Sequence, residues 1–279
     1  MEDLKGKVAV VTGGASGIGR ALCLAFAGEG ANVLVADLDE AGMAETAAGV
    51  EKTGAKGVTV RTDVTKLDSV EALAERAWKE LGGVHVLCNN AGVALYGGLE
   101  SATHHDWQWV LGVNLWGVIH GVEAFVPRMV AQKQPGHVVN TASMAGLIAS
   151  QGLGVYNTSK YAVVGLSETL QKDLRPYNIG VSVLCPLGVS TNIRNSERSR
   201  PPELKNPGGP REGDGIQLIG HGALVCPGCN LPVVIDDHVP ATRALRCGFC
   251  SHQAEARDFV ARDVFDTVGN EVYVVARVV

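Results

Sequence analysis

The two side chains best suited to acid–base chemistry are a tyrosine and a lysine four residues apart, Tyr156 and Lys160. If this stretch is helical, both side chains project from one face of the helix. A tyrosine with an ordinary pKa of about 10 is a poor base at neutral pH. A nearby lysine ammonium favours the phenolate and lowers that pKa, as a general base requires. Such a pair also occurs by chance on exposed helices, so other residues must support the interpretation.

Two further polar residues stand where they would assist a reaction. Ser143 follows an apolar run at 137–142 that we expect to be a strand, and its hydroxyl can donate a hydrogen bond to a substrate oxygen. Asn114 stands among apolar residues in a helical pattern at about 104–132. An asparagine in that setting needs a polar partner, so we keep it as a candidate site residue rather than a solvated helix position.

A glycine-rich loop near the N-terminus has the residues needed to hold a dinucleotide. The sequence Thr-Gly-Gly-Ala-Ser-Gly-Ile-Gly at 12–19 follows the apolar run 8–11 and opens a helical pattern. Glycines in such a strand–loop–helix allow a tight turn close to a pyrophosphate, and the helix N-terminus presents free N–H groups. The alternative is a glycine-rich turn that binds nothing. The candidate cofactor-binding residues here are Gly13, Ser16, Gly17, Ile18 and Gly19.

A second predicted strand, at 31–37, ends in Asp37, which lies 20 residues after Gly17. A carboxylate at this distance from the loop usually accepts hydrogen bonds from an adenosine ribose, and it would repel a 2′-phosphate. No arginine or lysine occurs at 13–19 or 38–40 to attract that phosphate. We therefore predict NAD rather than NADP, the alternative being a surface aspartate at a strand end.

The elements that must position these residues alternate along the chain. Apolar candidate strands at 8–11, 31–37, 57–62, 84–88, 137–142 and 179–185 alternate with helical patterns at 18–26, 40–53, 66–82, 104–132 and 155–177. Strands that are apolar on both faces and separated by helices indicate a parallel sheet covered on both sides. The predicted fold class is therefore α/β, with a Rossmann-type doubly wound parallel sheet.

Length and composition narrow the class of protein. The 279 residues suffice for one α/β domain and a smaller addition, and 46% hydrophobic residues with a net charge of −5 indicate a globular chain. The acidic balance argues against nucleic acid as a main partner. The N-terminus lacks the apolar region of a signal peptide, and we find no apolar run long enough to span a bilayer. We expect a cytoplasmic protein with no membrane partner.

The seven cysteines fall into two groups. Cys23, Cys88 and Cys185 are isolated among apolar residues and are expected to be inert core positions. The other four form two C-x2-C pairs separated by 17 residues, the spacing of a structural zinc ribbon in which four thiolates close a tetrahedral site. Redox-active dithiols and coincidental spacing are the alternatives. The predicted ligands of this structural Zn²⁺ are Cys226, Cys229, Cys247 and Cys250.

These features divide the chain into three parts: a catalytic domain at 1–192, a substrate loop or linker at 193–220, and a zinc-ribbon-like β domain at 221–279. The middle part is rich in charge, proline and glycine. In the last part five arginines oppose seven carboxylates, so it offers no basic stripe for nucleic acid. Its final run, 271–279, is a predicted strand that should pair with another, because a long unpaired apolar edge favours aggregation.

The order and spacing of these motifs resemble the short-chain dehydrogenase/reductase family over roughly residues 5–192. The residues that carry the resemblance are Thr12–Gly19, Asp37, Asp63-Val64, Asn89-Asn90-Ala91-Gly92, Asn114, Ser143, Tyr156 and Lys160. The resemblance implies a Rossmann-type sheet and nicotinamide-dependent hydride transfer at a carbinol carbon. It also implies a cofactor cleft lined by Asp63, Val64, Asn90 and Gly92, with Asp63 placed to reach the adenine amino group.

The same resemblance implies a role for each polar residue of the site. Tyr156 would remove the alcohol proton in the oxidative direction. Lys160 would lower the tyrosine pKa and hold the nicotinamide ribose. Ser143 would orient the substrate oxygen, and Asn114 would hold a water that links Lys160 to solvent.

Two departures from the family pattern follow the sixth predicted strand. The family often has Pro-Gly-x-Val-x-Thr here, whereas this chain has Pro-Leu-Gly-Val-Ser-Thr at 186–191. Pro186, Val189 and Thr191 remain candidates for contacts to the nicotinamide carboxamide. The family then usually continues with substrate-covering helices, a further helix and a seventh strand, and the sequence predicts none of these here.

The residues expected around the substrate are apolar: Val93, Ala94, Leu95 and Tyr96 on one side and Met144, Leu147, Ile148 and Leu153 on the other. We therefore predict an NAD-dependent oxidoreductase acting on a hydrophobic secondary alcohol or its ketone. The alternative is an NAD-binding sensor or scaffold protein whose zinc ribbon recruits a partner. The resemblance also suggests a homodimer or homotetramer that associates through the helices near 104–132 and 155–177.

Overall fold

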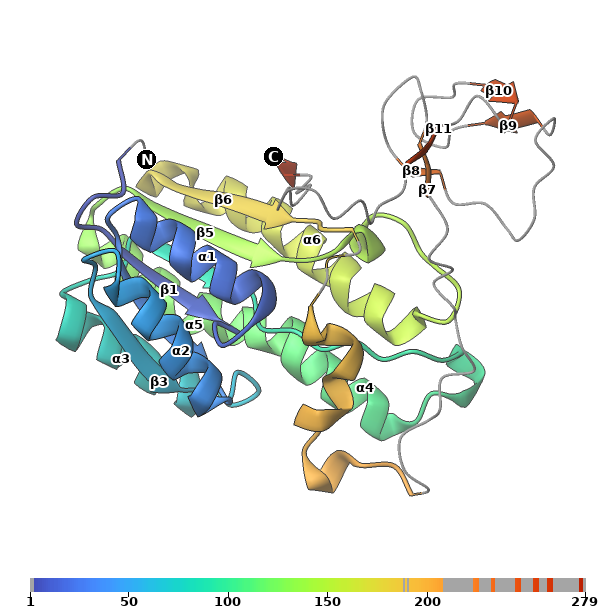
Figure 1. Ribbon diagram of the computed structural model, residues 1–279, viewed down its shortest axis with the longest axis horizontal. Coiled ribbons are helices and arrows are strands. Elements are labelled where there is room, and N and C mark those ends of the chain that lie inside the picture. The colour runs from blue at the N-terminus through green and yellow to red at the C-terminus, as the bar shows by residue number, and fades with distance from the viewer. Residues whose placement is uncertain are drawn as a thin grey trace. The chain divides into compact units, whose positions relative to one another are not determined.

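The computed structural model describes residues 3–187, 189 and 191–207, together with the backbone of six short strands between 223 and 277 (Figure 1). The chain divides into two compact units. One comprises Met1–Asp214 and Tyr273–Val279, and the other comprises Gly215–Val272. The last seven residues thus belong to the first unit, whereas the boundary predicted at 221 assigned them to the C-terminal segment.

The first unit is built on a sheet whose strands follow the order β12-β6-β5-β4-β1-β2-β3. Six of the strands are parallel: β1 Val8–Thr12, β2 Asn32–Asp37, β3 Gly57–Arg61, β4 Val86–Asn89, β5 Gly136–Thr141 and β6 Ile179–Leu184. The order reverses between β1 and β4, and in a doubly wound sheet a ligand crevice forms beyond the strand ends at such a point. The predicted Rossmann-type sheet is confirmed.

A seventh strand closes one edge of this sheet. The two-residue strand β12, Ala276–Arg277, pairs antiparallel with β6. The expectation that the chain lacks a seventh strand was therefore wrong. The expectation that the run 271–279 would pair with another element agrees with this pairing, which a local pattern could not locate because the partner lies about 90 residues earlier in the chain.

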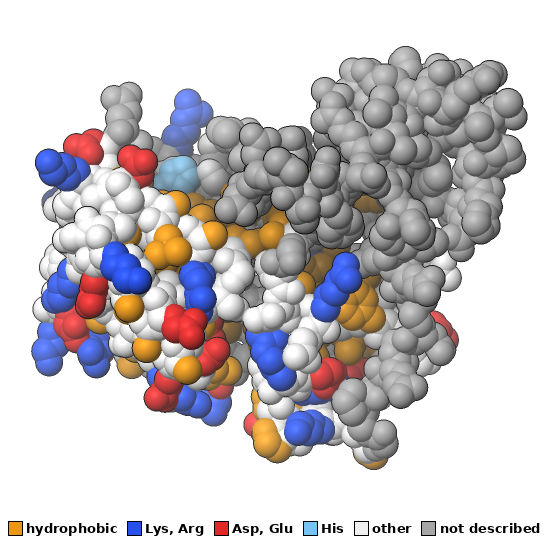
Figure 2. Space-filling view, viewed as in Figure 1, with side chains coloured by type: hydrophobic (Ala, Val, Ile, Leu, Met, Phe, Trp, Pro, Cys, Tyr) orange, Lys and Arg blue, Asp and Glu red, His pale blue; other side chains and the backbone are white. Residues whose placement is uncertain are grey.

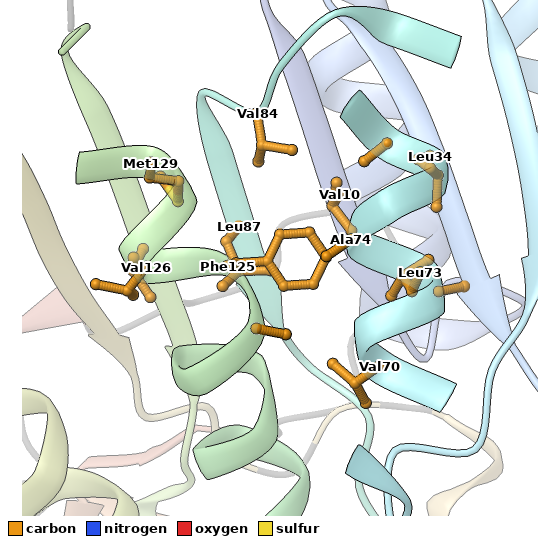
Figure 3. Packing of buried hydrophobic residues seen from close by; sticks show 14 of the residues in the cluster. Val10, Leu34, Val70, Leu73, Ala74, Val84, Leu87, Phe125, Val126 and Met129 are labelled. Carbon is orange, nitrogen blue, oxygen red and sulfur yellow. The ribbon is translucent and has the colours of Figure 1, made fainter. Parts of the chain in front are cut away.

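Helices cover both faces of the sheet because successive side chains of each strand point to opposite sides (Figure 1). Ala9 and Val11 of β1 pack against α1, Gly17–Gly28, and α2, Glu40–Glu51. Val10 points to the other face. There it packs with α3, Leu67–Leu81, and α5, Gly117–Gln132, around the fully buried ring of Phe125 (Figure 3).

The predicted helix at 104–132 is interrupted. It consists of α4, His104–Leu111, a π-helical turn η2, Gly112–Trp116, and α5. By length and composition the whole segment could cross a membrane, which the sequence analysis did not find, but 56% of its most apolar stretch is buried inside the fold. The core helix of a globular domain satisfies the same criteria.

The remaining elements of this unit are η1 Leu99–Ser101, η3 Met144–Gly146, α6 Gly154–Leu174, η4 Arg175–Tyr177, η5 Asn192–Ser199 and η6 Pro202–Leu204.

On the face shown in Figure 2, acidic and basic side chains are interspersed over the helices.

The second unit contains short antiparallel strands. One sheet has the order β11-β7-β8, and a separate pair joins β9 and β10. Their bounds are β7 Ala223–Val225, β8 Pro232–Val233, β9 Ala244–Arg246, β10 Gln253–Glu255 and β11 Val260–Arg262.

Candidate active site

The tyrosine and lysine lie on α6, as the four-residue spacing predicts. The side chains are buried, with 9% of Tyr156 and 2% of Lys160 exposed. Lys160 Nζ lies 5.6 Å from the centroid of the Tyr156 ring. It donates a hydrogen bond of 2.8 Å to the carbonyl oxygen of Thr141 at the end of β5. The end of β5 and the first turns of α6 therefore fix the position of the ammonium group.

Burial dominates the acid–base properties of this pair. It raises the pKa of Tyr156 to about 12; a side-chain hydrogen bond with Ser143 opposes this rise, and the nearby Tyr96 adds to it. Burial also lowers the pKa of Lys160 to about 8. The pKa of Tyr156 is not lowered as the sequence analysis expected, because the loss of hydration disfavours the phenolate. The phenol carries its proton at neutral pH.

Ser143 follows β5 after one intervening residue, Ala142, and is the N-terminal cap of η3. Its Oγ accepts a hydrogen bond of 3.2 Å from the amide of Ala145 and lies 3.5 Å from the carbonyl oxygen of Pro186. The same hydroxyl makes a side-chain hydrogen bond with Tyr156. The structure thus brings together the two hydroxyl groups that the sequence assigned to the substrate oxygen.

Asn114 is fully buried and lies in the π-helical turn η2. Its Oδ1 accepts from the amide of Val93 at 2.8 Å, and its Nδ2 donates to the carbonyl of Val93 at 2.9 Å and to Ser159 Oγ at 3.0 Å. These are the polar partners that the sequence required. A single π turn within an α-helix often marks a functional site.

Gly92 keeps space open beside this asparagine. A Cβ atom at Gly92 would lie 3.5 Å from Asn114 Oδ1 and 3.6 Å from Lys160 Nζ. Asn90, two residues earlier, links the ends of two strands: its Nδ2 donates to the carbonyl of Thr12 at 3.0 Å, and its Oδ1 accepts from Thr141 Oγ1 at 3.2 Å.

The glycine loop has the close contacts that only glycine allows. Gly13 and Gly17 adopt positive φ angles of 68° and 54°. A Cβ on Gly13 would lie 2.8 Å from the Cα of Ala91, and a Cβ on Gly19 would collide with the carbonyl oxygen of Gly13. Ser16 caps α1 without a side-chain hydrogen bond. The first N–H groups of α1 therefore remain available to an anion, which fits a pyrophosphate.

Asp37 is held at the end of β2 by three backbone amides. Its Oδ2 accepts from Ala15 at 3.1 Å, and its Oδ1 accepts from Leu38 at 2.7 Å and Asp39 at 3.1 Å. Asp63 is fixed in a similar way by Thr65, whose amide and hydroxyl donate at 3.0 Å and 2.7 Å. Both carboxylates border the cleft, where hydroxyl and amino groups of an adenosine could reach them.

A cleft of about 580 Å³ connects the glycine loop with Tyr156. Its walls include these predicted residues: Gly13, Ser16, Gly17, Ile18, Gly19, Asp37, Asp63, Val64, Asn90, Gly92, Tyr156, Lys160, Pro186 and Thr191. Asn114, Ser143 and Val189 do not line it. The cleft is large enough for a small-molecule ligand and combines backbone donors with carboxylates, which fits a dinucleotide such as NAD.

The sequence analysis missed several residues of this cleft. They are Leu38, Asp39, Thr62, Val113, Thr141, Ala142, Asn192, Ile193, Ser196, Arg198 and Ser199. Val93, which was expected beside the substrate, and Ala91 of the motif at 89–92 also line the cleft. The cleft residues after 191 belong to residues 192–207, which we call the cover segment. The sequence predicts a substrate loop or linker from residue 193. The structure instead has the short helices η5 and η6 at this position.

A buried ion pair anchors the cover segment. Arg200 Nη2 lies 2.6 Å from Asp106 Oδ1, and 2% and 0% of the two side chains are exposed. The guanidinium also lies 4.8 Å from the ring centroid of Trp109. Burial opposes the ionisation of Asp106, but hydrogen bonds from Thr103, Arg200 and Asn206 outweigh it and lower its pKa to about 2. The two residues are 94 positions apart in the chain, so the local sequence around either one does not indicate the ion pair.

The predicted zinc ligands, Cys226, Cys229, Cys247 and Cys250, lie outside the described residues. Within the described part of the chain, no group of three or more His, Cys, Asp or Glu side chains is arranged to hold a metal. Cys23, Cys88 and Cys185 are buried, as expected for core cysteines.

Comparison with known proteins agrees with this architecture. Residues 7–202 match the family described as short chain dehydrogenase. A short-chain dehydrogenase/reductase from Burkholderia phymatum, solved in complex with NAD, is 46% identical, with a TM-score of 0.74 over 76% of each chain.

Two curated proteins also match over most of the chain. A CLA biosynthesis dehydrogenase/reductase from Lactiplantibacillus plantarum is 34% identical over 212 residues, which are 75% of this chain and 74% of that protein. A C alpha-dehydrogenase from a Sphingobium species is 36% identical over 202 residues, 72% and 66% of the two chains. This protein therefore belongs to the short-chain dehydrogenase/reductase family of NAD-dependent oxidoreductases.

Proposed function

We propose that this protein interconverts a hydrophobic secondary alcohol and its ketone, with NAD as the hydride acceptor or donor and Tyr156 as the acid or base. The observation that carries the proposal is the placement of Ser143, Tyr156 and Lys160 together beside a cleft whose far end holds the glycine loop and Asp37. Proton transfer and dinucleotide binding would thus occur in one continuous cavity.

The protonated phenol of Tyr156 supports a direct role in ketone reduction. With its pKa raised to about 12, the hydroxyl holds a proton at neutral pH that it can give to a carbonyl oxygen. Ser143, hydrogen-bonded to the same phenol, would orient that oxygen. Bound NAD supplies the hydride chemistry, which no side chain of the protein can perform. In the oxidative direction the phenolate form of Tyr156 takes the proton from the alcohol, and the ammonium group of Lys160 stabilises that phenolate.

An apolar setting around the tyrosine supports a hydrophobic substrate. The ring of Tyr156 packs in a cluster with Ala94 and Ala145, and Tyr96, Leu153 and Ile193 pack against the cluster. Three of the eight residues expected to surround the substrate, Ala94, Tyr96 and Leu153, belong to this cluster or border it. A polar substrate would lose hydration here without gaining partners.

A spectrophotometric panel tests the proposal. Purified protein is incubated with NAD⁺ or NADP⁺ and a series of aliphatic, alicyclic and aromatic secondary alcohols, and with the reduced cofactors and the corresponding ketones. We expect turnover with the NAD pair on apolar members, followed by absorbance at the nicotinamide band. Tight NAD binding without turnover of any alcohol or ketone in the panel would instead favour the sensor or scaffold function. Such a function does not require the buried pair of Tyr156 and Lys160.

We further propose that the C-terminal unit binds one structural Zn²⁺ through Cys226, Cys229, Cys247 and Cys250. Support comes from the C-x2-C spacing and from the strands on either side in the sequence: the first cysteine pair falls between β7 and β8, and the second falls between β9 and β10. Both strand pairs are antiparallel. Thiolates supplied by two antiparallel hairpins are typical of zinc ribbons.

A homodimer or homotetramer is the proposed assembly. Trp116, the last residue of η2, is 51% exposed, and Tyr161 on α6 is 44% exposed. Aromatic residues exposed on long helices are frequent at subunit interfaces. Light scattering of the purified chain, with Trp116→Glu as the disrupting variant, tests this assignment.

A further inference from the structure

We propose that Arg198 of the cover segment binds the pyrophosphate of the dinucleotide, so that the phosphates are held between the helix N-terminus of α1 and a guanidinium from the opposite wall. This inference rests on the proposed function, because it assumes that NAD occupies the cleft. It assigns a charged contact that the glycine loop itself does not contain.

A short series of contacts places Arg198 beside the glycine loop. A Cβ atom at Gly17 would lie 3.0 Å from the Cγ2 of Thr191, so the residue that precedes the cover segment lies directly on the loop. The next residue, Asn192, accepts a hydrogen bond of 2.9 Å from Arg198 Nη1 through its carbonyl. The guanidinium is therefore bonded to the residue next to the one that contacts Gly17. Arg198 also borders the cleft.

The charges of the cleft leave one cation for an anionic ligand. The described residues that line it include three carboxylates, Asp37, Asp39 and Asp63, and two cations, Lys160 and Arg198. Lys160 is buried and donates to the carbonyl of Thr141, beside the tyrosine. A pyrophosphate brings negative charge into a cleft that already contains an excess of carboxylates. Arg198 is the group that can offset this charge at the end near α1.

The guanidinium is also held in place. Its Nη1 donates to the carbonyls of Asn192 and Asn195 at 2.9 Å and 2.7 Å. Within the described residues its Nε and Nη2 have no hydrogen-bond partner, so these donors remain for phosphate oxygens. The segment that carries Arg198 is anchored on one side by Ser196, whose Oγ accepts from the amide of Ala94 at 3.0 Å. The buried pair of Arg200 with Asp106 anchors it on the other.

Ligand fragments separate this role from a purely structural one. Dissociation constants for NADH, ADP-ribose and adenosine are measured by fluorescence and by competition, for the wild type, Arg198→Gln and Arg194→Gln. Arg194 is exposed on the same short helix but does not border the cleft, so its variant is the matched control. We expect Arg198→Gln to weaken NADH and ADP-ribose about tenfold, as loss of a charged hydrogen bond does, and to leave adenosine unchanged.

Further outcomes decide the question. Arg198→Lys should recover part of the affinity for ADP-ribose, and added salt should weaken the wild type more than Arg198→Gln. Equal losses for adenosine and ADP-ribose would show that Arg198 only shapes the segment, and unchanged binding would also overturn the assignment. If the wild type binds none of the three ligands, the proposed function itself fails. That result is distinct from the case in which wild type binds and the variant matches it.

Discussion

The ammonium nitrogen of Lys160 lies 5.6 Å from the ring centroid of Tyr156, on the same face of α6, and donates a hydrogen bond to the carbonyl oxygen of Thr141 rather than to the phenol. Burial acts on the two groups in opposite directions, raising the pKa of the tyrosine and lowering that of the lysine. Both shifts favour the neutral forms. The pair is therefore suited to hold a proton on the phenol and to lose the lysine charge within an accessible pH range.

The first prediction concerns pH. We expect kcat/KM for ketone reduction to be constant near neutral pH and to fall above about pH 8, because Lys160, with its pKa lowered to about 8, loses its charge as pH rises through that value. The phenol of Tyr156 remains protonated over this range. In Lys160→Arg the guanidinium does not titrate, so any residual activity should lack the fall. A wild-type profile that stays flat to pH 10 would contradict the assignment.

The second prediction concerns cofactor choice. Asp37→Asn keeps the shape of the side chain and removes the charge that would repel a 2′-phosphate. We expect the ratio of the dissociation constants for NADP⁺ and NAD⁺ to fall at least about tenfold, which corresponds to about 1.4 kcal/mol. The control is Glu40→Gln, an exposed carboxylate three residues away. An unchanged ratio would show that Asp37 does not select the cofactor.

The third prediction concerns the cover segment. Removing one partner of a buried ion pair costs about 3–5 kcal/mol, so Arg200→Met should raise the opening of residues 192–207 more than about a hundredfold. Hydrogen exchange followed by mass spectrometry should show faster exchange there and little change in β1–β6. Arg76→Met breaks the more exposed pair with Glu80. It should change the exchange rates neither in residues 192–207 nor in β1–β6. Unaltered exchange in 192–207 would mean that the pair does not anchor the segment.

The fourth prediction concerns metal content. Native mass spectrometry should detect one zinc per chain in the wild type and none in a variant with both Cys226→Ser and Cys247→Ser. The core substitution Cys185→Ala should retain the metal. Affinity for NAD should be similar in the wild type and the double variant, because the described residues that line the cleft all belong to the first unit. Metal-free wild-type protein would exclude a structural zinc site.

Much of the site could be predicted because it depends on local geometry. The positions of Gly13 and Gly17 follow from backbone angles that favour glycine, and the approach of Tyr156 to Lys160 follows from the helical repeat. The end of an apolar strand determines where Asp37 lies. Each of these features is encoded within a few residues, so the sequence pattern is sufficient.

The features that sequence reasoning missed depend on distant contacts. The π turn around Asn114 interrupts a stretch, about 104–132, whose sequence pattern predicts one continuous helix. The helices of the cover segment are held by the pairing of Arg200 with Asp106, across 94 residues. The raised pKa of Tyr156 results from burial by several elements at once, which no spacing within α6 indicates.

The substitution Tyr156→Phe tests the central claim most directly. It removes the hydroxyl and keeps the ring that packs with Ala94 and Ala145. With a ketone or alcohol found active in the panel, kcat should fall about a thousandfold, the contribution expected of a general acid or base, while the dissociation constant for NADH stays within about twofold. Tyr161→Phe, an exposed tyrosine on the same helix, should keep wild-type activity. Turnover of Tyr156→Phe at a rate close to the wild type would contradict the account.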